Sequence, residues 1–343
     1  MRTFAQRLIQ WQQEKGRHHL PWQKPDAYAR WLSEIMLQQT QVNTVLGYYN
    51  RFLERFPTVQ DLANAPQEEV MRLWAGLGYY TRARNLHRCA QMVCENYQGQ
   101  FPDTRQELEQ LPGIGRSTAA AIAAFSFKRR EAILDGNVKR VLCRHFLIEG
   151  HPSQSAVQKQ LWQCAQELLP QTDVDVYTQA LMDLGALVCT RNPQCSVCPL
   201  KQTCRAFQEQ VQGQYPQPKP KKQRPEKHRT FLLYWKDDAV VLQKRTQKGV
   251  WQGLYSLPEL EGTVTEETLL QRAVQDGFEV KNVRFLEPII HDFSHYRLHM
   301  HPVALALKTQ PTLIEPTVWA NQEKRRGSGL PAPIQVLLDE FFE

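Results

Sequence analysis

The sequence lacks any apolar run long enough to span a membrane. Its first residues, MRTFAQRLIQWQQEKG, are amphipathic and show neither the apolar core nor the cleavage site of a signal peptide. These absences lead us to expect a cytoplasmic protein with no membrane partner. Since thiols stay reduced in that compartment, we do not expect disulfides among the eight cysteines.

Acidic residues are in deficit: 35 Asp and Glu stand against 42 Lys and Arg, which gives a net charge of +7. The basic residues gather in clusters instead of spreading evenly, and such clustering favours a polyanionic partner. An inert basic surface would explain one cluster more easily than four. The four clusters are Arg82, Arg84 and Arg88; Lys128, Arg129 and Arg130; Lys139, Arg140 and Arg144; and 219–229.

Strand-type alternation is missing from residues 1–210, where apolar residues recur every three or four positions. Proline and glycine separate these periodic segments. We therefore predict an all-α domain over 1–210, built of two helical lobes with a cleft between them. The expected helices lie near 3–15, 28–40, 43–55, 67–75, 83–97, 117–127, 137–147, 155–169 and 175–188.

The composition of the rest of the chain changes twice, at residue 211 and at residue 229. Residues 211–228 are rich in Pro, Gln and Lys and predict an extended, basic linker. Beyond them, TFLLYW, KDD and AVVLQKR predict a β-hairpin. A small α/β domain over 229–343 is therefore expected. It would be completed by strands near 280–290 and 296–308 and by helices near 265–276 and 333–342.

The stretch 111–137 joins a Pro-Gly-x-Gly turn, a small-residue helix, a basic patch and an acidic turn. Thr104 and Glu107 form a capping-box signature, which predicts a helix leading into the turn. Gly113 and Gly115 would end that helix and let backbone amides at the start of the next one approach a phosphate. A helix-hairpin-helix of this kind holds a DNA backbone without reading its sequence. An ordinary helix–helix turn is the alternative.

Four of the eight cysteines fall in CTRNPQCSVCPLKQTC, with spacings of five, two and five. Four thiolates this close can surround one metal centre. Structural zinc modules more often contain two Cys-x-x-Cys pairs, and tandem thiolates also suit an iron–sulfur cluster, so spacing alone leaves both open. The predicted ligands are Cys189, Cys195, Cys198 and Cys204. For Cys89, Cys94, Cys143 and Cys164 we expect buried apolar positions.

Two acids suit the cleavage of a glycosidic bond. Glu34 lies in a strongly apolar helix, where burial would favour its neutral form and allow it to donate a proton. Asp135 precedes a helix whose N-terminus, with Lys139 and Arg140, is expected to keep it ionised. Bond cleavage needs such an acid for the leaving group and an anion for the oxocarbenium-like sugar. The alternatives are an exposed surface Glu34 and a plain helix cap from Asp135 or Asn137.

These motifs together resemble the endonuclease III superfamily of DNA glycosylases, and within it the MutY-type adenine DNA glycosylases. The resemblance covers nearly the whole chain and rests on SEIMLQQTQV, GLGYYTRARNLH, LPGIGRSTA, LDGNVKRV, MDLGALVC and the late FSH. It implies an all-α, two-lobed helix-hairpin-helix glycosylase domain with a four-cysteine cluster, followed by an α/β Nudix-like domain. It also implies a monomeric, bacterial, nucleoid-associated enzyme of base excision repair. This enzyme would flip adenine out of duplex DNA and hydrolyse it where it lies opposite 8-oxoguanine or G.

The resemblance also implies roles for single residues. Glu34 would protonate adenine N7, and Asp135 would stabilise the cationic sugar. Asn137 would supply an active-site amide, and Asp183 a further acid. The four clustered cysteines would hold a [4Fe–4S] cluster, although this chain has five residues between the first two where the family usually has six. On the DNA side, Gln39 and Tyr79 would wedge into the duplex. Further contacts are expected from Arg82, Gly113, Gly115, Lys139 and Gly253.

Ser117 stands where bifunctional relatives have a lysine that attacks C1′ as an amine. Because serine cannot form that imine, we predict base removal without efficient strand cleavage. Some relatives have a tyrosine here, which leaves the role of the hydroxyl open, and Lys139 could supply a weak lyase activity.

The C-terminal domain resembles Nudix hydrolases but lacks the helix acids that would hold magnesium. We therefore expect it to recognise 8-oxoguanine, whose N7–H is a donor where guanine has an acceptor. A strand-end turn is the simpler interpretation of the recognition loop from spacing alone. The positions that lack acids are Gln271, Val274 and Gln275, and the expected recognition loop is Phe293, Ser294 and His295, with Ser294 forming the hydrogen bond.

Two other functions are possible alternatives from the motifs alone. An endonuclease III-type glycosylase/lyase acting on oxidised pyrimidines conflicts with Ser117 and with the extra domain. A DNA-binding scaffold without chemistry conflicts with the presence of both Glu34 and Asp135.

Overall fold

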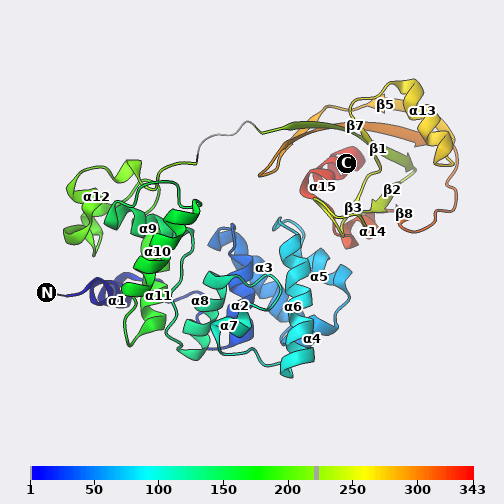
Figure 1. The fold of residues 1–343 in the computed structure, drawn as a ribbon. Coiled ribbons are helices and arrows are strands. Elements are labelled where there is room, and N and C mark those ends of the chain that lie inside the picture. The colour runs from blue at the N-terminus through cyan, green and yellow to red at the C-terminus, as the bar shows by residue number, and fades with distance from the viewer. Residues whose placement is uncertain (1, 220–223) are drawn as a thin grey trace. The chain divides into compact units, whose positions relative to one another are not determined.

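The structure, a computed structural model, describes every residue except Met1 and 220–223 (Figure 1). No helix in this described part of the chain is long and apolar enough to cross a membrane. Residues 220–223 belong to the predicted linker and lie outside the described residues. The chain forms two compact units: one contains Met1–Asn64 and Asn85–Lys221, and the other contains Ala65–Arg84 and Lys222–Glu343.

The first unit is helical, as the apolar periodicity predicts. Asp26 caps the N-terminus of α2 by accepting hydrogen bonds from the amides of Tyr28 and Ala29, at 3.2 and 3.0 Å. Its helices are α1 (Phe4–Lys15), α2 (Ala27–Met36), α3 (Val42–Arg55), α4 (Val59–Asn64), α6 (Thr81–Tyr97, which begins in the other unit), α7 (Arg105–Leu108), α8 (Arg116–Phe127), α9 (Gly136–Phe146), α10 (Ser155–Glu167), α11 (Val174–Asp183) and α12 (Arg205–Gln208).

Most predicted helices agree with these bounds to within a few residues. The short helices α4 and α12 were not predicted, because six and four residues are too few to show a periodic pattern. The last predicted helix changes form along its length: α11 ends at Asp183, and Leu184–Val188 continue it as a π-helical turn, η1. Such π-turns are frequent at functional sites.

The predicted helix-hairpin-helix is present as α7, a glycine turn and α8. The Thr104 hydroxyl oxygen accepts a hydrogen bond from the Glu107 amide at 3.3 Å, so the expected cap of α7 is formed. Gly113 adopts φ +80°, and a Cβ there would lie 3.0 Å from Cβ of Asn85. The turn therefore needs glycine for both its conformation and its close packing.

Helix α8 is the central element of this unit, and it packs against α2, α7 and α11. Its residues Ala119–Ala124 are almost completely buried, and their small side chains allow neighbouring helices to approach closely. This packing brings the end of α2, the start of α8, the turn before α9 and the end of α11 toward one region.

The second unit contains an eight-stranded mixed sheet with the strand order β3-β2-β1-β7-β5; β4 also pairs with β1, β6 with β7, and β8 with β2. The predicted β1–β2 hairpin is present, and β1 also pairs in parallel with β7. The strands are β1 (Glu226–Lys236), β2 (Ala239–Lys244), β3 (Tyr255–Ser256), β4 (Glu259–Glu261), β5 (Val280–Phe285), β6 (Ile289–Asp292), β7 (Arg297–Leu307) and β8 (Thr317–Ala320). Strand β1 begins inside the segment predicted as linker.

Helices lie against both faces of β1, as strand alternation requires. Leu232 and Tyr234 pack in one core cluster with Leu269 and Ala273 of α13, while the Trp235 ring contacts Phe341 of α15. Helices α13 and α15 were predicted, and α14, β3, β4 and β8 were not. The helices of this unit are α5 (Gln67–Trp74), α13 (Glu266–Gln275), α14 (Gln322–Gly327) and α15 (Ala332–Phe342).

Candidate active site

A pocket of about 620 Å³ opens in the helical unit where α2, α8, α9 and η1 approach one another. Four predicted site residues line it, although they come from separate parts of the sequence: Glu34, Ser117, Asp135 and Asn137. A pocket of this volume can hold a small-molecule ligand. The packing of α8 thus assembles the predicted acids and the predicted amide in one place.

Glu34 lies near the end of α2, with part of its surface open to the pocket. Desolvation is the largest influence on its carboxyl group and raises its pKa from 4.5 to about 7. The Arg30 guanidinium opposes this shift, and the negative charge of Asp135 adds to it. Near neutral pH a substantial fraction of Glu34 is therefore protonated, so it can donate a proton as the sequence indicated.

Asp135 is the N-cap of α9, and its Oδ1 accepts the Val138 amide at 2.8 Å. Amide hydrogen bonds from Val138 and Asn137 and the charge of Arg140 all stabilise its anion. Burial nevertheless outweighs them and raises its pKa above 3.8. The sequence did not reveal the desolvation of this turn, which works against the ionised state expected for Asp135. The expectation that the helix N-terminus stabilises the anion is confirmed.

The two carboxyl groups interact, since the charge of Asp135 raises the pKa of Glu34. Desolvation disfavours ionisation of both carboxyl groups. Amide hydrogen bonds and the Arg140 charge stabilise an anion on Asp135, whereas on Glu34 the Arg30 charge favours the anion and the Asp135 charge opposes it. The arrangement with a neutral Glu34 and an ionised Asp135 is therefore favoured.

Asn137 is held in place by Arg140 from the same helix. The Arg140 guanidinium donates to Asn137 Oδ1 at 2.8 Å and to the Gly185 carbonyl at 2.7 Å. A Cβ at Gly185 would lie 2.4 Å from the Asn137 Cβ, so η1 can pass this close only because residue 185 is glycine. Sequence reasoning did not find the roles of Arg140 and Gly185, although the glycine of MDLG was a signal.

Asp183, predicted as a further acid, is completely buried beside the pocket. Its carboxylate accepts the Arg17 amide at 2.7 Å, the Arg17 Nε at 2.8 Å and the Gln179 side-chain amide at 2.8 Å. These bonds connect the end of α11 to the chain segment after α1. The carboxylate is thus occupied by structural partners, while Arg17 reaches the pocket wall.

Ser117 lies in the first turn of α8, and its hydroxyl oxygen accepts a hydrogen bond from the Leu134 amide at 2.9 Å. This bond fixes the start of α8 to the turn that carries Asp135. The neighbouring Thr118 hydroxyl accepts a long hydrogen bond from Gln38 at 3.4 Å. The hydroxyl of Ser117 thus has a positioning role that the sequence left open.

The predicted DNA-contacting residues differ in their solvent exposure and in whether their side chains already form hydrogen bonds within the protein. Gln39 and Tyr79 both have a positive φ, 58° and 49°, and both are exposed. Arg82 is half-buried and donates to the carbonyls of Leu77 and Gly78, at 3.1 and 3.3 Å. Arg82 therefore stabilises the turn before α6.

The start of α8 has free hydrogen-bonding capacity. Its N-cap residue is Gly115, which has no side chain to accept hydrogen bonds from the first amides of the helix. Uncapped amides at a helix N-terminus attract anions. Lys139 is half-buried in α9.

The four clustered cysteines line one cavity in the helical unit, together with Arg144 and Lys201. All four are free thiols, and Arg144 donates to the Cys189 sulfur at 3.4 Å. A single zinc ion would hold its four sulfurs roughly 3.8 Å apart, from Zn–S bonds of about 2.3 Å. Within the described residues, no three of these sulfurs lie within 4.8 Å of one another. The donor set thus fits a metal centre.

In the second unit, the expected recognition loop forms the turn between β6 and β7. The Phe293 amide donates to the Tyr296 carbonyl at 2.9 Å, and the Phe293 ring packs on Trp251. Ser294 and His295 are exposed, with Ser294 Oγ 3.4 Å from His295 Nδ1. Gly253 has φ +84°, as the turn before β3 requires.

Comparison with known proteins places this fold and site in a class. The family model of HhH-GPD superfamily base excision DNA repair proteins matches residues 32–167, and a NUDIX domain model matches residues 229–340. The solved structure of a thermostable thymine-DNA glycosylase is 27% identical, with a TM-score of 0.55 over 60% of this chain and 95% of that one. The class is therefore that of helix-hairpin-helix DNA repair enzymes with an added Nudix-like domain.

Similarity along the full chain identifies the family within this class. The adenine DNA glycosylase of Buchnera aphidicola is 36% identical over 99% of this chain and 97% of its own length. The human adenine DNA glycosylase is 34% identical over 94% of this chain and 71% of its own length. The chain belongs to the adenine DNA glycosylase family, and it is an enzyme of base excision repair. The predicted fold class and enzyme class are thereby confirmed.

Proposed function

We propose that this enzyme hydrolyses adenine from duplex DNA where it lies opposite 8-oxoguanine or G, and that it does so without cutting the strand. The observation that carries the proposal is the pairing of Glu34 and Asp135 in one pocket. Desolvation raises the pKa of Glu34 to about 7, and Asp135 caps α9 beside it.

The chemistry follows from these two environments. Adenine flipped from the stack enters the pocket, and the protonated Glu34 carboxyl donates its proton to N7 of the base. The C1′–N9 bond then breaks with its electron pair leaving on the base, and positive charge develops on the sugar. The Asp135 carboxylate stabilises that charge, and water adds to C1′ and gives up a proton to one of the two carboxylates, which balances the proton that Glu34 donated. Arg140 and Gly185 hold Asn137 beside this reaction.

Strand cleavage requires an amine that forms an imine at C1′. Ser117 occupies the wall of the pocket where such an amine would stand, and its hydroxyl already accepts the Leu134 amide. A hydroxyl cannot form an imine. The product is therefore an intact strand with an abasic site.

Two groups of residues contact the DNA duplex. The uncapped amides at the start of α8 bind a backbone phosphate, with Gly113 and Gly115 allowing close approach. Gln39 and Tyr79, both exposed in left-handed turns, insert beside the target base. Inserted side chains offset part of the unstacking cost, which is a few kcal/mol per step by order of magnitude.

The β6–β7 turn reads the partner base. Ser294 is exposed, while the ring of Phe293 anchors the turn on Trp251. A serine hydroxyl can accept the N7–H that 8-oxoguanine has and guanine lacks. Preference for 8-oxoguanine thus rests on Ser294.

Cys189, Cys195, Cys198 and Cys204 hold a [4Fe–4S] cluster in this proposal. The support is four free thiols around one cavity, among whose described sulfurs no three lie within 4.8 Å of one another. When bound, the cluster would supply a covalent cross-link of the chain between η1 and α12. Arg144 donates to the Cys189 sulfur and to the Thr190 carbonyl at 2.6 Å, so it supports the ligand loop.

One assay tests the proposal. The protein is incubated with duplexes that contain A opposite 8-oxoguanine, A opposite G, thymine glycol opposite A, or no lesion, and products are resolved with and without hot alkali. Strand breaks in the two adenine duplexes that appear only after alkali are expected. Cutting at thymine glycol without alkali would overturn the assignment. Ser294→Ala should lower the preference for 8-oxoguanine over G, whereas Ser155→Ala, at an exposed position on α10, should leave it unchanged.

A further inference from the structure

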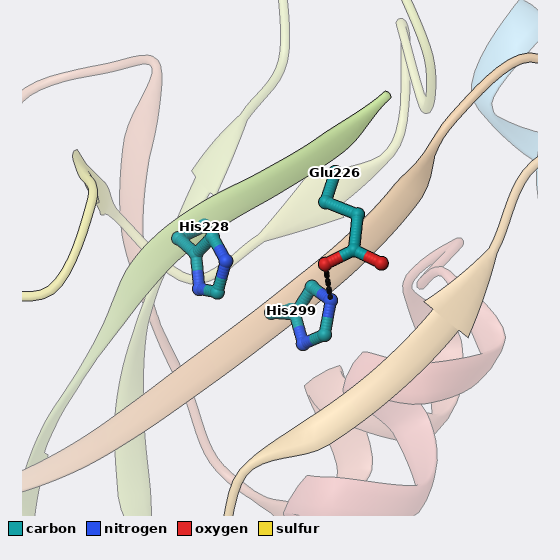
Figure 2. Close-up of side chains that lie close together, drawn as sticks. All are labelled: Glu226, His228 and His299. Carbon is teal, nitrogen blue, oxygen red and sulfur yellow. Dashed lines mark hydrogen bonds and ion pairs between the residues drawn. The ribbon is translucent and has the colours of Figure 1, made fainter. Parts of the chain in front are cut away.

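The sheet of the second unit carries a group of imidazoles that the glycosylase chemistry does not use. In the parallel register of β1 and β7, His228 is the partner of His299, while Glu226 and His301 stand two residues away from them. Residues two apart in a strand share a face. Figure 2 shows Glu226, His228 and His299 projecting toward one another from these two strands.

The face they share is the one that packs on α13 further along the strands. Leu232 and Tyr234 of β1, and Val303 and Leu305 of β7, have the same parity and belong to the core cluster that includes α13. Beyond that core the face becomes polar and accessible: Glu226 and His228 are exposed, and His299 is half-buried. An aqueous ion can therefore reach it.

The distances are close to those of a metal site. One candidate ligand atom from each of Glu226, His228 and His299 lies within 4.8 Å of the others. His299 Nε2 is 3.1 Å from Glu226 Oε2, and His228 Nδ1 is 3.1 Å from His301 Nε2. Zinc with bonds of about 2.0–2.1 Å keeps tetrahedral ligand atoms roughly 3.3 Å apart. Small side-chain rotations would close the remaining gap.

The packing of the rings and the pairing of the nearby arginine also suit a cation site. The ring of His228 stacks on that of His299, with centroids 4.4 Å apart, and lies 5.3 Å from that of His301. The nearby Arg297 donates its hydrogen bonds to Asp292, at 2.7 and 3.1 Å, and interacts with Glu226 through charge alone.

We propose that Glu226, His228 and His299, with His301 beside them, form a binding site for a divalent transition metal, with zinc as the best fit. Neutral imidazoles with one carboxylate are a donor set that zinc favours. The ion would cross-link the first residues of β1 to β7 and so stabilise the sheet at this end of the two strands. This site is separate from the four clustered cysteines, and it does not depend on the proposed glycosylase mechanism.

The test is calorimetric titration of zinc into the full-length, cluster-loaded protein. His228→Asn and His299→Gln should each lower the affinity of one zinc site at least tenfold. His151→Gln, which alters a partly exposed histidine of the helical unit, should leave it unchanged. Saturating zinc should raise the thermal midpoint of wild type and of the control, and should not raise that of the two site variants. Equal zinc binding by all four proteins would overturn the proposal.

A substitution that keeps a ligand separates coordination from a structural effect. His299→Cys should retain zinc binding, and with Co²⁺ in place of zinc it should add a thiolate-to-cobalt charge-transfer band relative to wild type. If His299→Cys loses zinc as fully as His299→Gln, or adds no such band, residue 299 does not coordinate the metal and the proposed site is wrong.

Discussion

Replacing Glu34 with glutamine should have opposite effects on activity and stability. Activity should fall because glutamine cannot donate the proton, and general acid catalysis typically contributes a factor of about 10² to 10⁴. Stability should rise at alkaline pH because desolvation works against the ionised carboxylate of the wild type. The shift of its pKa from 4.5 to about 7 corresponds to about 3 kcal/mol, as an upper bound.

The sign of the pH dependence follows from linkage. A carboxyl whose pKa is raised on folding binds more protons in the folded state, so wild-type stability falls as pH rises from about 4.5 to about 7. Glutamine does not titrate. The stability of Glu34→Gln relative to wild type should therefore increase by about 2–3 kcal/mol between pH 5 and pH 8. The net pKa shift already includes the attraction between Arg30 and the ionised carboxylate, so this term is not counted again.

The assay is denaturant unfolding of both proteins at several pH values, followed by single-turnover base release on the same samples. Glu34→Asn serves as a matched control, since it also removes the charge but shortens the side chain. A Glu34→Gln protein that is inactive, and whose relative stability does not change with pH, would refute the desolvation argument.

Three further predictions follow from the site. Gly185→Ala should reduce base release at least tenfold in single-turnover kinetics, because the new Cβ would lie 2.4 Å from that of Asn137; wild-type kinetics would show that η1 can move away freely. Ser117→Lys should add borohydride-trappable, alkali-independent strand cleavage to the same adenine substrates, and a protein that forms no covalent adduct would contradict the placement of residue 117 beside C1′. Cys198→Ser should lower the iron content below the roughly four per chain expected for wild type, whereas Cys89→Ser, at a buried position outside the cluster, should not; equal iron in both would remove Cys198 from the ligand set.

Local patterns predicted the helices, the hairpin and the two acids because each depends on neighbours in the sequence. The Thr104 cap, the Gly113 turn and the periodicity of α8 are of this kind. The convergence of Glu34 and Asp135 depends on how closely α2 approaches α8, and the alanines of α8 indicated such packing without specifying its partner. Family resemblance supplied what spacing could not, above all the choice of base.

Four features of the structure could not be read from the sequence. Burial of Asp135 raises its pKa, and that burial is produced by residues distant in sequence. Arg82 sits in a basic cluster, but its guanidinium is bound to backbone carbonyls of its own turn. Asp183 matches a motif acid, yet Arg17 occupies it from 166 residues away. The histidines of β1 and β7 drew no attention, because only the parallel register brings residues 228 and 299 together.

The central claim is that Glu34 delivers the proton that releases adenine, and the pH dependence of the single chemical step tests it most directly. The single-turnover rate of base release from A opposite 8-oxoguanine should be measured from pH 5 to pH 9 for wild type and Glu34→Gln. We predict a wild-type rate that falls tenfold per pH unit above about pH 7, the pKa of Glu34. The variant should be slower by about 10² or more and should lack this decline. A wild-type rate that stays flat to pH 9, or a variant that retains the same decline, would contradict the assignment.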